Sequence, residues 1–355
     1  MRKTVFGCGF ALAACVGLLF AQGGPGAAKG KEDKGPAPCD RACLEGFVDQ
    51  YLDALVAHNP FGGLPLAARV KFSENDQLLD LGDGLWNVTT AVGKYRLIVA
   101  DPQSQQVAFL GTVLANDRPT TLALRLKLDN RKISEIETLV TVSNPPGGPG
   151  GPGGAKAAPK GPTPPLTGAA ALDAMGAPDA VFKQAETQRS SREQLIAAAN
   201  AYFDAMERGD AGLAQFDPQC NRIENGVQMT NNPTPNLPAK TVDPRALSCA
   251  DQISAKVLSN YQVVYPRRIP VVDEERQTVF GFFMHQQPGD VTQVDSPGRG
   301  LYKFSEANSQ PGFVEVAQVF KVIGGRIRRM ESLTAPVPYG TPNPFFNDDW
   351  RRAKK

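Results

Sequence analysis

The sequence predicts an α+β fold made of two tandem cone-shaped units, each with helices packed on a curved antiparallel sheet. The prediction rests on an amphipathic helix pattern and a following run of strand patterns, each of which occurs twice along the 355 residues. A tract rich in proline and glycine separates the two occurrences. Hydrophobic residues make up 41% of the chain and charged residues 21%, which is the composition of a globular protein.

Each unit opens with an amphipathic helix. Apolar side chains recur at helical spacing in both segments, and Tyr51 and Tyr202 occupy matching places. The apolar positions are Leu44, Phe47, Val48, Tyr51, Leu52 and Leu55 in the first helix, and Leu195, Ile196, Ala199, Tyr202, Phe203 and Met206 in the second. In the first unit we expect Trp86 and Tyr95 to flank a second helix.

The strand patterns follow in the same order in both units. A Glu-Asn pair in a strand context comes first, at Glu74 in the first unit and Glu224 in the second. Three longer strands then follow, at 106–114, 120–128 and 133–142 in the first unit and at 278–285, 312–322 and 326–333 in the second. The second unit carries extra polar, proline-rich residues, mostly in 229–248 and 286–311.

Composition predicts the division of the chain. Arg2 and Lys3 precede an apolar run that ends at Phe20, which is typical of a secretory signal peptide. The predicted segments are a signal peptide (1–21), a flexible leader (22–38), the first cone domain (39–142), a Pro/Gly/Ala-rich linker (143–189), the second cone domain (190–340) and a C-terminal tail (341–355). Within the linker, the Ala-rich part 167–188 is open between a further helix and more linker.

These features predict a secreted or periplasmic protein with no membrane span in the mature chain. The sequence Leu12-Ala13-Ala14-Cys15 is similar to a bacterial lipobox, so a lipoprotein anchored through Cys15 is the alternative. The net charge of +2 gives no reason to expect nucleic acid as a partner.

Four of the six cysteines remain in the mature chain, and an even number in an oxidising compartment predicts two disulfides. Of the three pairings, we favour the local one, which joins Cys39 to Cys43 and Cys220 to Cys249. A metal site would need histidines or carboxylates at ligand spacing, but the two histidines, His58 and His285, lie far apart in the sequence. No metal and no other cofactor is therefore expected.

The layout of helix, short hairpin, helix and three long strands resembles the nuclear transport factor 2-like, cystatin-like cone. The resemblance covers about 39–142 and about 190–335. More narrowly, Cys39-Asp40-Arg41-Ala42-Cys43-Leu44 and Glu224-Asn225-Gly226-Val227-Gln228 are similar to a poorly characterised bacterial and fungal family that includes some fungal isomerases. The resemblance implies an apolar pocket at the open end of a cone, and sheet-to-sheet packing as an intramolecular pseudodimer or a homo-oligomer. It implies no particular activity, because this fold hosts enzymes and binders alike.

Strand alternation selects the candidate pocket residues. Phe72 and Glu74 share one face of their predicted strand, and Arg222 and Glu224 share the equivalent face in the second unit. Each glutamate either enters the pocket or closes its hairpin. A buried carboxyl has a raised pKa and can exchange protons near neutral pH, which makes Glu224 a candidate acid or base.

His285 is the third candidate. Aligning 279–285 with 108–114 places it opposite Leu114, so that Glu224, Arg222 and His285 would form a catalytic cluster. The expected pocket around this cluster is aromatic and consists of Tyr202, Phe280, Phe282 and Phe283, with Glu74 in the first unit. The alternative places His285 at a strand end, facing water.

Two functions therefore stay open at this point. The first is a metal-independent acid/base isomerase, lyase or hydrolase acting on a small, partly apolar substrate. The second is a non-catalytic binding or structural module, secreted or tethered to the cell envelope.

Overall fold

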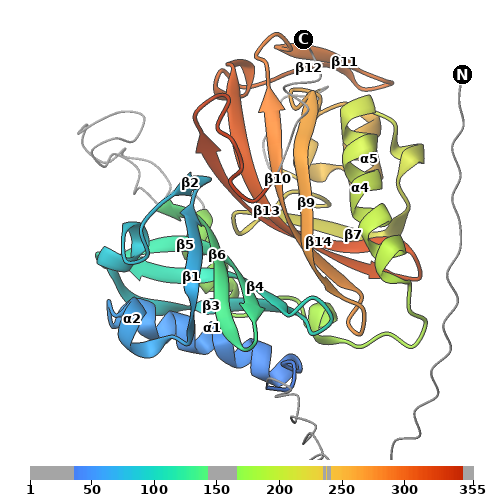
Figure 1. Ribbon diagram of the computed structural model, residues 1–355. Coiled ribbons are helices and arrows are strands. Elements are labelled where there is room, and N and C mark those ends of the chain that lie inside the picture. Colours follow the sequence, from blue (N-terminus) through green and yellow to red (C-terminus); the bar gives the residue numbers. More distant parts are fainter. Residues whose placement is uncertain (1–35, 143–165, 235–236, 238–240, 347–355) are drawn as a thin grey trace, which may run out of the picture. The chain divides into compact units, whose positions relative to one another are not determined.

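The computed structural model describes residues 36–142, 166–234, 237 and 241–346 (Figure 1). The described residues belong to one compact unit. Its described part contains two six-stranded sheets with helices, which confirms the α+β prediction. The predicted signal peptide with Cys15, most of the leader and most of the linker lie outside the described residues.

The first half (36–142) holds one helix-covered sheet. Its helices are α1 (Arg41–Val56) and α2 (Pro60–Gly63). Its strands are β1 (Leu66–Glu74), β2 (Gln77–Leu78), β3 (Thr89–Asp101), β4 (Gln106–Ala115), β5 (Arg118–Asp129) and β6 (Lys132–Val142). They lie in the order β2-β1-β6-β5-β4-β3, and every neighbouring pair is antiparallel except β1 and β6, which are parallel.

The second half (166–346) repeats this arrangement. Its helices are α3 (Gly168–Met175), α4 (Arg192–Arg208) and α5 (Cys249–Ser254). Its large sheet contains β7 (Phe216–Glu224), β8 (Val227–Gln228), β9 (Val263–Asp273), β10 (Thr278–Gln287), β13 (Gly312–Ile323) and β14 (Arg326–Val337). The order β8-β7-β14-β13-β10-β9, with β7 and β14 parallel, is that of the first sheet. Strands β11 (Gln293–Ser296) and β12 (Gly300–Lys303) form a separate hairpin in the second half.

The two long helices begin where the sequence supplies capping groups. The carboxylate of Asp40 accepts a hydrogen bond from the backbone N–H of Cys43. Ser191 and Gln194 form a reciprocal capping box at the start of α4, and Gly209 ends that helix in the left-handed conformation. Each helix buries its apolar stripe against one face of its own sheet, which we call the inner face (Figure 1).

The α-helix that the sequence predicts between Trp86 and Tyr95 is not formed. Residues Gly84–Asn87 make a single 3-10 turn, and Tyr95 lies in strand β3, which pairs with β4. The equivalent strand β9 was not predicted either. The pairing of β3 shifts register between Val92 and Arg96, and β9 contains two prolines, so neither strand has an unbroken alternating pattern.

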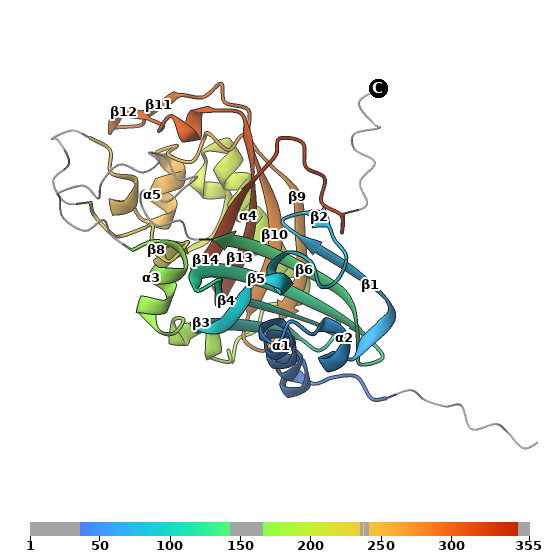
Figure 2. The ribbon, with the colours of Figure 1, turned by 90° about the vertical axis from the view of Figure 1, so that its left-hand side faces the viewer.

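The outer faces of the two sheets pack against each other. A separate apolar cluster joins residues of both sheets there, and Leu172 of α3 and Phe182 contribute to it. Part of the predicted linker is therefore a helix, and it lies beside β8, where the Gly168 backbone N–H donates to the Asn225 carbonyl at 2.7 Å (Figure 2). At one edge of the interface Arg41 binds Asp273 through two hydrogen bonds of 2.6 and 2.7 Å.

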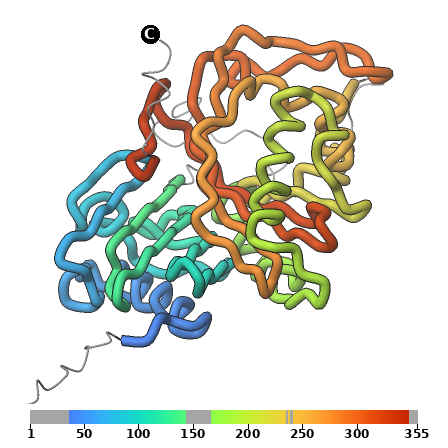
Figure 3. The backbone as a smooth tube through the Cα atoms, turned by 45° about the vertical axis from the view of Figure 1, so that its right-hand side comes forward, coloured from blue at the N-terminus to red at the C-terminus, as the bar shows by residue number. Residues whose placement is uncertain are grey.

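The chain after β14 returns to the first half (Figure 3). Asn343 donates from Nδ2 to Asp76 Oδ1 at 2.8 Å, and the Lys71 ammonium lies 4.6 Å from the centre of the Phe345 ring. The start of the predicted C-terminal tail is thus packed on the fold.

Two disulfides are formed, Cys39–Cys43 and Cys220–Cys249, as predicted. They fit an extracellular or periplasmic location. Within the described residues, every helix is too short or too polar to cross a membrane.

Candidate functional site

Strand pairing aligns the two halves position by position. The carboxylates Glu137 and Glu331 hold matching places in the last strands of their sheets. In the first sheet Glu137 pairs with Arg125, which in turn pairs with Ala108. In the second sheet Glu331 pairs with Val319, which in turn pairs with Phe280. Ala108 therefore corresponds to Phe280.

The predicted alignment of His285 is wrong by one residue. By the same register His285 corresponds to Val113, an interior residue of the first half, and not to Leu114. Because side chains alternate along a strand, this shift reverses the face. His285 therefore points to the inner face and does not face water as a strand-end residue; its side chain is 8% exposed.

Arg222 lies on the inner face of β7, in the place of Phe72 in the first half. Its guanidinium is buried and donates from Nη1 to Glu224 Oε2 at 2.7 Å and from Nη2 to Gln252 Oε1 at 3.2 Å. The third nitrogen, Nε, is buried and has no hydrogen-bond partner among the described residues. The side chain of Glu224 is 35% exposed, so this carboxylate lies at the rim of the interior.

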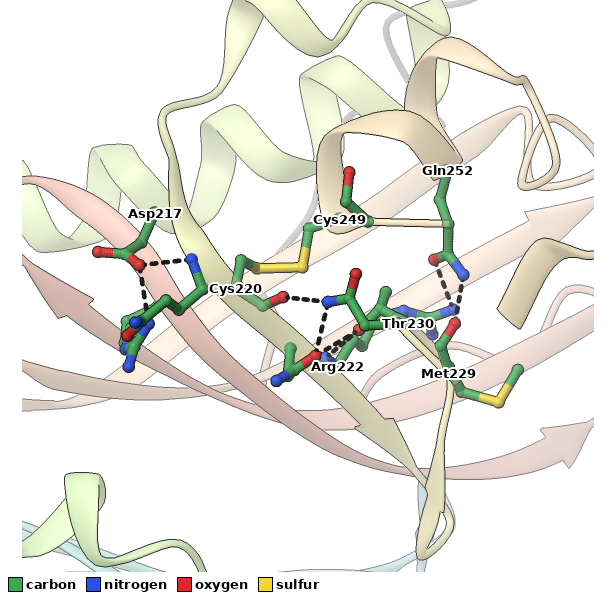
Figure 4. The surroundings of a disulfide bond; sticks show 12 residues. Asp217, Cys220, Arg222, Met229, Thr230, Cys249 and Gln252 are labelled. Carbon is green, nitrogen blue, oxygen red and sulfur yellow. Dashed lines mark hydrogen bonds and ion pairs between the residues drawn. A yellow bond between two sulfur atoms is a disulfide. The ribbon is translucent and has the colours of Figure 1, made fainter. Parts of the chain in front are cut away.

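Helix α5 covers the arginine (Figure 4). The Gln252 amide donates from Nε2 to the backbone carbonyls of Pro244, at 2.6 Å, and Met229. The disulfide Cys220–Cys249 ties the same helix to β7. These contacts hold Gln252 over Arg222.

His285 is enclosed by aromatic rings. The ring centres of Phe203 and Tyr261 lie 5.8 and 4.9 Å from that of the imidazole, both in edge-on geometry. Its Nε2 is buried and has no hydrogen-bond partner in the described part of the chain. Burial lowers the pKa of His285 to about 3, and the positive charges of Arg222 and Arg267 act in the same direction. The imidazole is therefore neutral at ordinary pH.

Gln318 is the inner-face residue that the sequence analysis missed. It lies in β13 between Val316 and Phe320, which both belong to the inner-face core of the second half. Its register position corresponds to Leu124. Its amide nitrogen is buried and, within the described residues, makes no hydrogen bond. The alternation of β13 was sufficient to find it, because this strand otherwise presents apolar residues on that face.

The aromatic residues divide between the two faces of the sheet. Tyr202 and Phe283 lie on the inner face, and the Phe283 ring centre is 4.3 Å from that of Phe203. Phe280 and Phe282 do not line that interior. They lie on the outer face and pack in the cluster between the two sheets, because they alternate with Phe283 along β10.

Glu74 has a local role in the first half. Its Oε2 accepts a hydrogen bond of 3.1 Å from the backbone N–H of Leu85 and so fixes the turn before β3. Burial raises the pKa of this carboxyl, while the hydrogen bond from Leu85 favours its ionised form. At the positions of Arg222, His285 and Gln318 the first half has Phe72, Val113 and Leu124. The first half therefore has apolar side chains where the second half has these three polar ones.

Two clefts in the described part of the chain lie away from this polar set. One of about 490 Å³ opens beside α4, between Gln194 and Gly325. Another, of about 410 Å³, lies between Arg96 and Phe182. Neither of these two clefts is lined by Arg222, His285 or Gln318.

The comparisons with known proteins assign no activity to this chain. Residues 188–334 match the model of a domain of unknown function (DUF8021). The comparison with curated proteins finds no match.

Among solved structures, the chain is similar to a protein of unknown function with a cystatin-like fold from Methylobium petroleophilum, at 12% identity over 45% of this chain and 86% of that one, with a TM-score of 0.26. It is similar to AusH from Aspergillus nidulans at 12% identity over 41% and 86%, with a TM-score of 0.24. A SnoaL-like polyketide cyclase from Jannaschia gives 12% identity over 41% and 90%, with a TM-score of 0.23. Similarity at this level assigns no activity to the chain.

Proposed function

We propose that the second half binds a small, partly apolar molecule on its inner face, with hydrogen bonds from Arg222, His285 and Gln318. One observation carries this proposal: each of these side chains has a buried nitrogen without a partner among the described residues. The first half has Phe72, Val113 and Leu124 at the same positions, so the fold itself does not need polar groups there.

An unpaired buried polar group is costly. Leaving a donor or acceptor without a partner costs about 1–3 kcal/mol in protein mutational data, and more for a charged group. Three such atoms on one inner face together impose a cost that an apolar interior avoids. A ligand that pairs with them removes this cost on binding, which makes the unpaired state reasonable for a receptor.

The donors define the ligand chemistry. Arginine Nε and glutamine Nε2 only donate, so the ligand would present acceptor oxygens, as in a ketone or a carboxylate. His285 is neutral and adds either a donor or an acceptor, depending on its tautomer. The rings of Phe203 and Phe283 supply the apolar contact. A ligand oxygen could also replace Gln252 on Arg222.

The first half supplies the test variants. Gln318→Leu, His285→Val and Arg222→Phe each install the residue that the first half carries. We would screen the full chain by thermal shift against a panel of aromatic and aliphatic ketones and carboxylates, and then measure binding by calorimetry. Gln318→Leu should stabilise the ligand-free chain by about 1 kcal/mol and weaken binding about tenfold. Leu124→Gln in the first half is the matched control and should leave binding unchanged. Equal affinities for the wild type and all three variants would overturn the proposal.

Acid/base catalysis is the second candidate, with Glu224 as the group that moves the proton. The observation that favours it is the position of the carboxylate, which is bonded to the buried Arg222 but is itself 35% exposed. It can thus contact both the interior and solvent. His285 is a poor base because its pKa is about 3. With a ligand from the screen as substrate, Glu224→Gln should abolish turnover but retain binding; turnover that persists would exclude this role.

A further inference from the structure

The interface between the two sheets contains three carboxylates that the proposed function does not use. Asp76 lies in the turn between β1 and β2, Glu137 in β6 and Glu315 in β13. One oxygen of each lies within 4.8 Å of the others, and all three residues are buried. The group brings a turn of the first half against the outer face of the second sheet.

Glu137 is fully paired. Arg125 donates from Nε to its Oε2 at 2.7 Å, and Arg268 of the second half donates from Nη1 to its Oε1. Burial alone would raise the pKa of this carboxyl, but Arg268 and Arg125 hold it below its usual value. Glu137 is therefore ionised and has no oxygen left without a donor.

Asp76 and Glu315, which we call the acid pair, are not paired in this way. Both oxygens of Glu315 and the Oδ2 of Asp76 are buried and have no donor among the described residues. The Oδ1 of Asp76 accepts the amide of Asn343. Two carboxylates this close, with three oxygens that lack donors, cannot both stay ionised in a buried site.

The charged groups around the acid pair leave it short of positive charge. Arg268 of β9 is the cation that faces both carboxyls, and it already binds Glu137. Arg125 of β5 is shared between Glu137 and Glu135. A metal ion fits poorly here, because Glu137 is occupied by two guanidinium groups that repel a cation. A proton satisfies the remaining oxygens without that repulsion.

We propose that Asp76 and Glu315 share one proton at neutral and mildly alkaline pH, and that this O–H···O bond links the first half to the second sheet. The link joins the β1–β2 turn to β13. Gln318 lies in the same strand, with its side chain on the opposite, inner face of the sheet. The contribution of this bond to the association of the two sheets then weakens as pH rises.

The titration of the pair gives the sign of this effect. Burial raises the pKa of Asp76 to about 7, and the neighbouring Glu137 acts in the same direction. Burial and Asp76 raise the pKa of Glu315 well above its usual range. At these two carboxyls the folded chain therefore holds more protons than the unfolded chain from about pH 4 upward. Stability falls as pH rises through this window, and falls more gently above about pH 7, where only one proton remains.

The first experiment observes the proton directly. The infrared spectrum of the full chain at pH 8 should contain the carbonyl stretch of a protonated carboxylic acid. Glu315→Gln should remove that band, and the exposed control Glu306→Gln should retain it. A wild-type spectrum at pH 8 without the band, or a band that Glu315→Gln leaves unchanged, would overturn the proposal.

The second experiment measures thermal unfolding from pH 5 to 8.5. Glu315→Gln replaces the shared proton by an amide N–H, so it should raise the unfolding temperature at pH 8 by a few degrees and flatten its fall with pH. Asp76→Asn should act in the same direction and serves if the first variant fails to fold. A bound cation gives the opposite result: calcium or magnesium would raise the unfolding temperature of the wild type, and a chelator and both variants would lower it. That outcome contradicts the shared proton.

Discussion

The hydroxyl of Tyr95, on the first sheet, donates a hydrogen bond to the carboxyl of Glu331, on the second sheet. Both residues are buried in the interface between the sheets. Glu331 corresponds to Glu137, which two arginines hold ionised. Glu331 has a different environment: Arg329 approaches to 3.7 Å, and burial raises the pKa of the carboxyl to about 7, although Tyr95 and Arg329 favour the ionised form. The interface thus contains two corresponding glutamates, one with a lowered pKa and one with a raised pKa.

This hydrogen bond predicts the effect of Tyr95→Phe. Removing the phenol hydroxyl leaves the Glu331 carboxyl without its best donor in a buried site. The free energy of unfolding should fall by about 1–2 kcal/mol in urea titrations at pH 6. Tyr339→Phe is the matched control, because Tyr339 is 61% exposed, and it should change the unfolding free energy by less than about 0.5 kcal/mol. Equal effects of the two variants would contradict the assignment.

Glu331→Gln tests the charge state of the same carboxyl. Its folded pKa is above the unfolded value, so the wild type loses stability as pH rises from about 4 to about 7. Glutamine accepts from Tyr95 but does not titrate. The variant should therefore gain stability relative to the wild type as pH rises through this window, and the difference should stay constant above it. Urea unfolding at half-unit pH intervals measures the difference, and a difference that does not vary with pH would refute it.

Local patterns predicted most of the helices and strands, and they failed where faces had to be assigned. The amphipathic stripes identified α1 and α4, and alternation along β7 placed Arg222 on the inner face. The same alternation along β10 separates Phe280 from Phe283, but adjacent phenylalanines were interpreted as one pocket. The one-residue error at His285 arose because sequence similarity is weak in that strand, whereas the hydrogen-bonded register is unambiguous.

The acid pair lay beyond what any local pattern can predict. Asp76 is a turn residue, and Glu315 lies on the outer face of an apolar strand. Each is ordinary in its own half, and a surface strand would expose such a glutamate. They become neighbours only when the outer faces of the sheets pack, a relationship that depends on contacts between residues more than 200 positions apart. A single sequence contains no signal for such a pair.

The pair Arg222 and Glu224 predicts a non-additive double substitution. Glu224→Ala leaves a buried guanidinium without its counter-charge and should destabilise the chain by about 2–3 kcal/mol, less than for a fully buried pair because Glu224 is 35% exposed. Arg222→Phe installs the residue of the first half and removes the charge itself. The double variant should therefore be more stable than Glu224→Ala alone. A double-mutant cycle in urea checks this coupling, and additive effects would argue against a functional ion pair.

The two disulfides should contribute unequally. Cys220 and Cys249 are separated by 29 positions, whereas Cys39 and Cys43 are separated by 4. The entropy lost by the unfolded chain grows with the size of the closed loop, which gives about 3–4 kcal/mol for the long loop and about 2 kcal/mol for the short one. Paired Cys→Ala variants should follow this order in urea unfolding. The long-loop variant should also expose Arg222 through release of α5, which faster amide exchange at Gln252 would report.

His285 offers a test that separates it from every other residue of the interior. Its pKa of about 3 follows from burial and from the positive charges of Arg222 and Arg267. The unfolded chain binds a proton at this residue near pH 6.5 and the folded chain does not, so His285 lowers stability as pH falls from about 6.5 toward 3. This direction is opposite to that of Asp76, Glu315 and Glu331 in the interface. His285→Val should therefore gain stability relative to the wild type below pH 6, and the gain should vanish above pH 7.

Magnetic resonance can observe the imidazole itself. The chain contains only two histidines, so its spectrum has two imidazole Hε1 signals, and His285→Val identifies the one that disappears. That signal should not shift between pH 5 and pH 8, because the ring stays neutral throughout. A ligand that places an anionic oxygen beside Nε2 favours the protonated ring and should bring its titration into this range. A free chain whose His285 signal titrates near pH 6.5 would mean that water reaches the ring, and the buried set of unpaired nitrogens would then lose one of its three members.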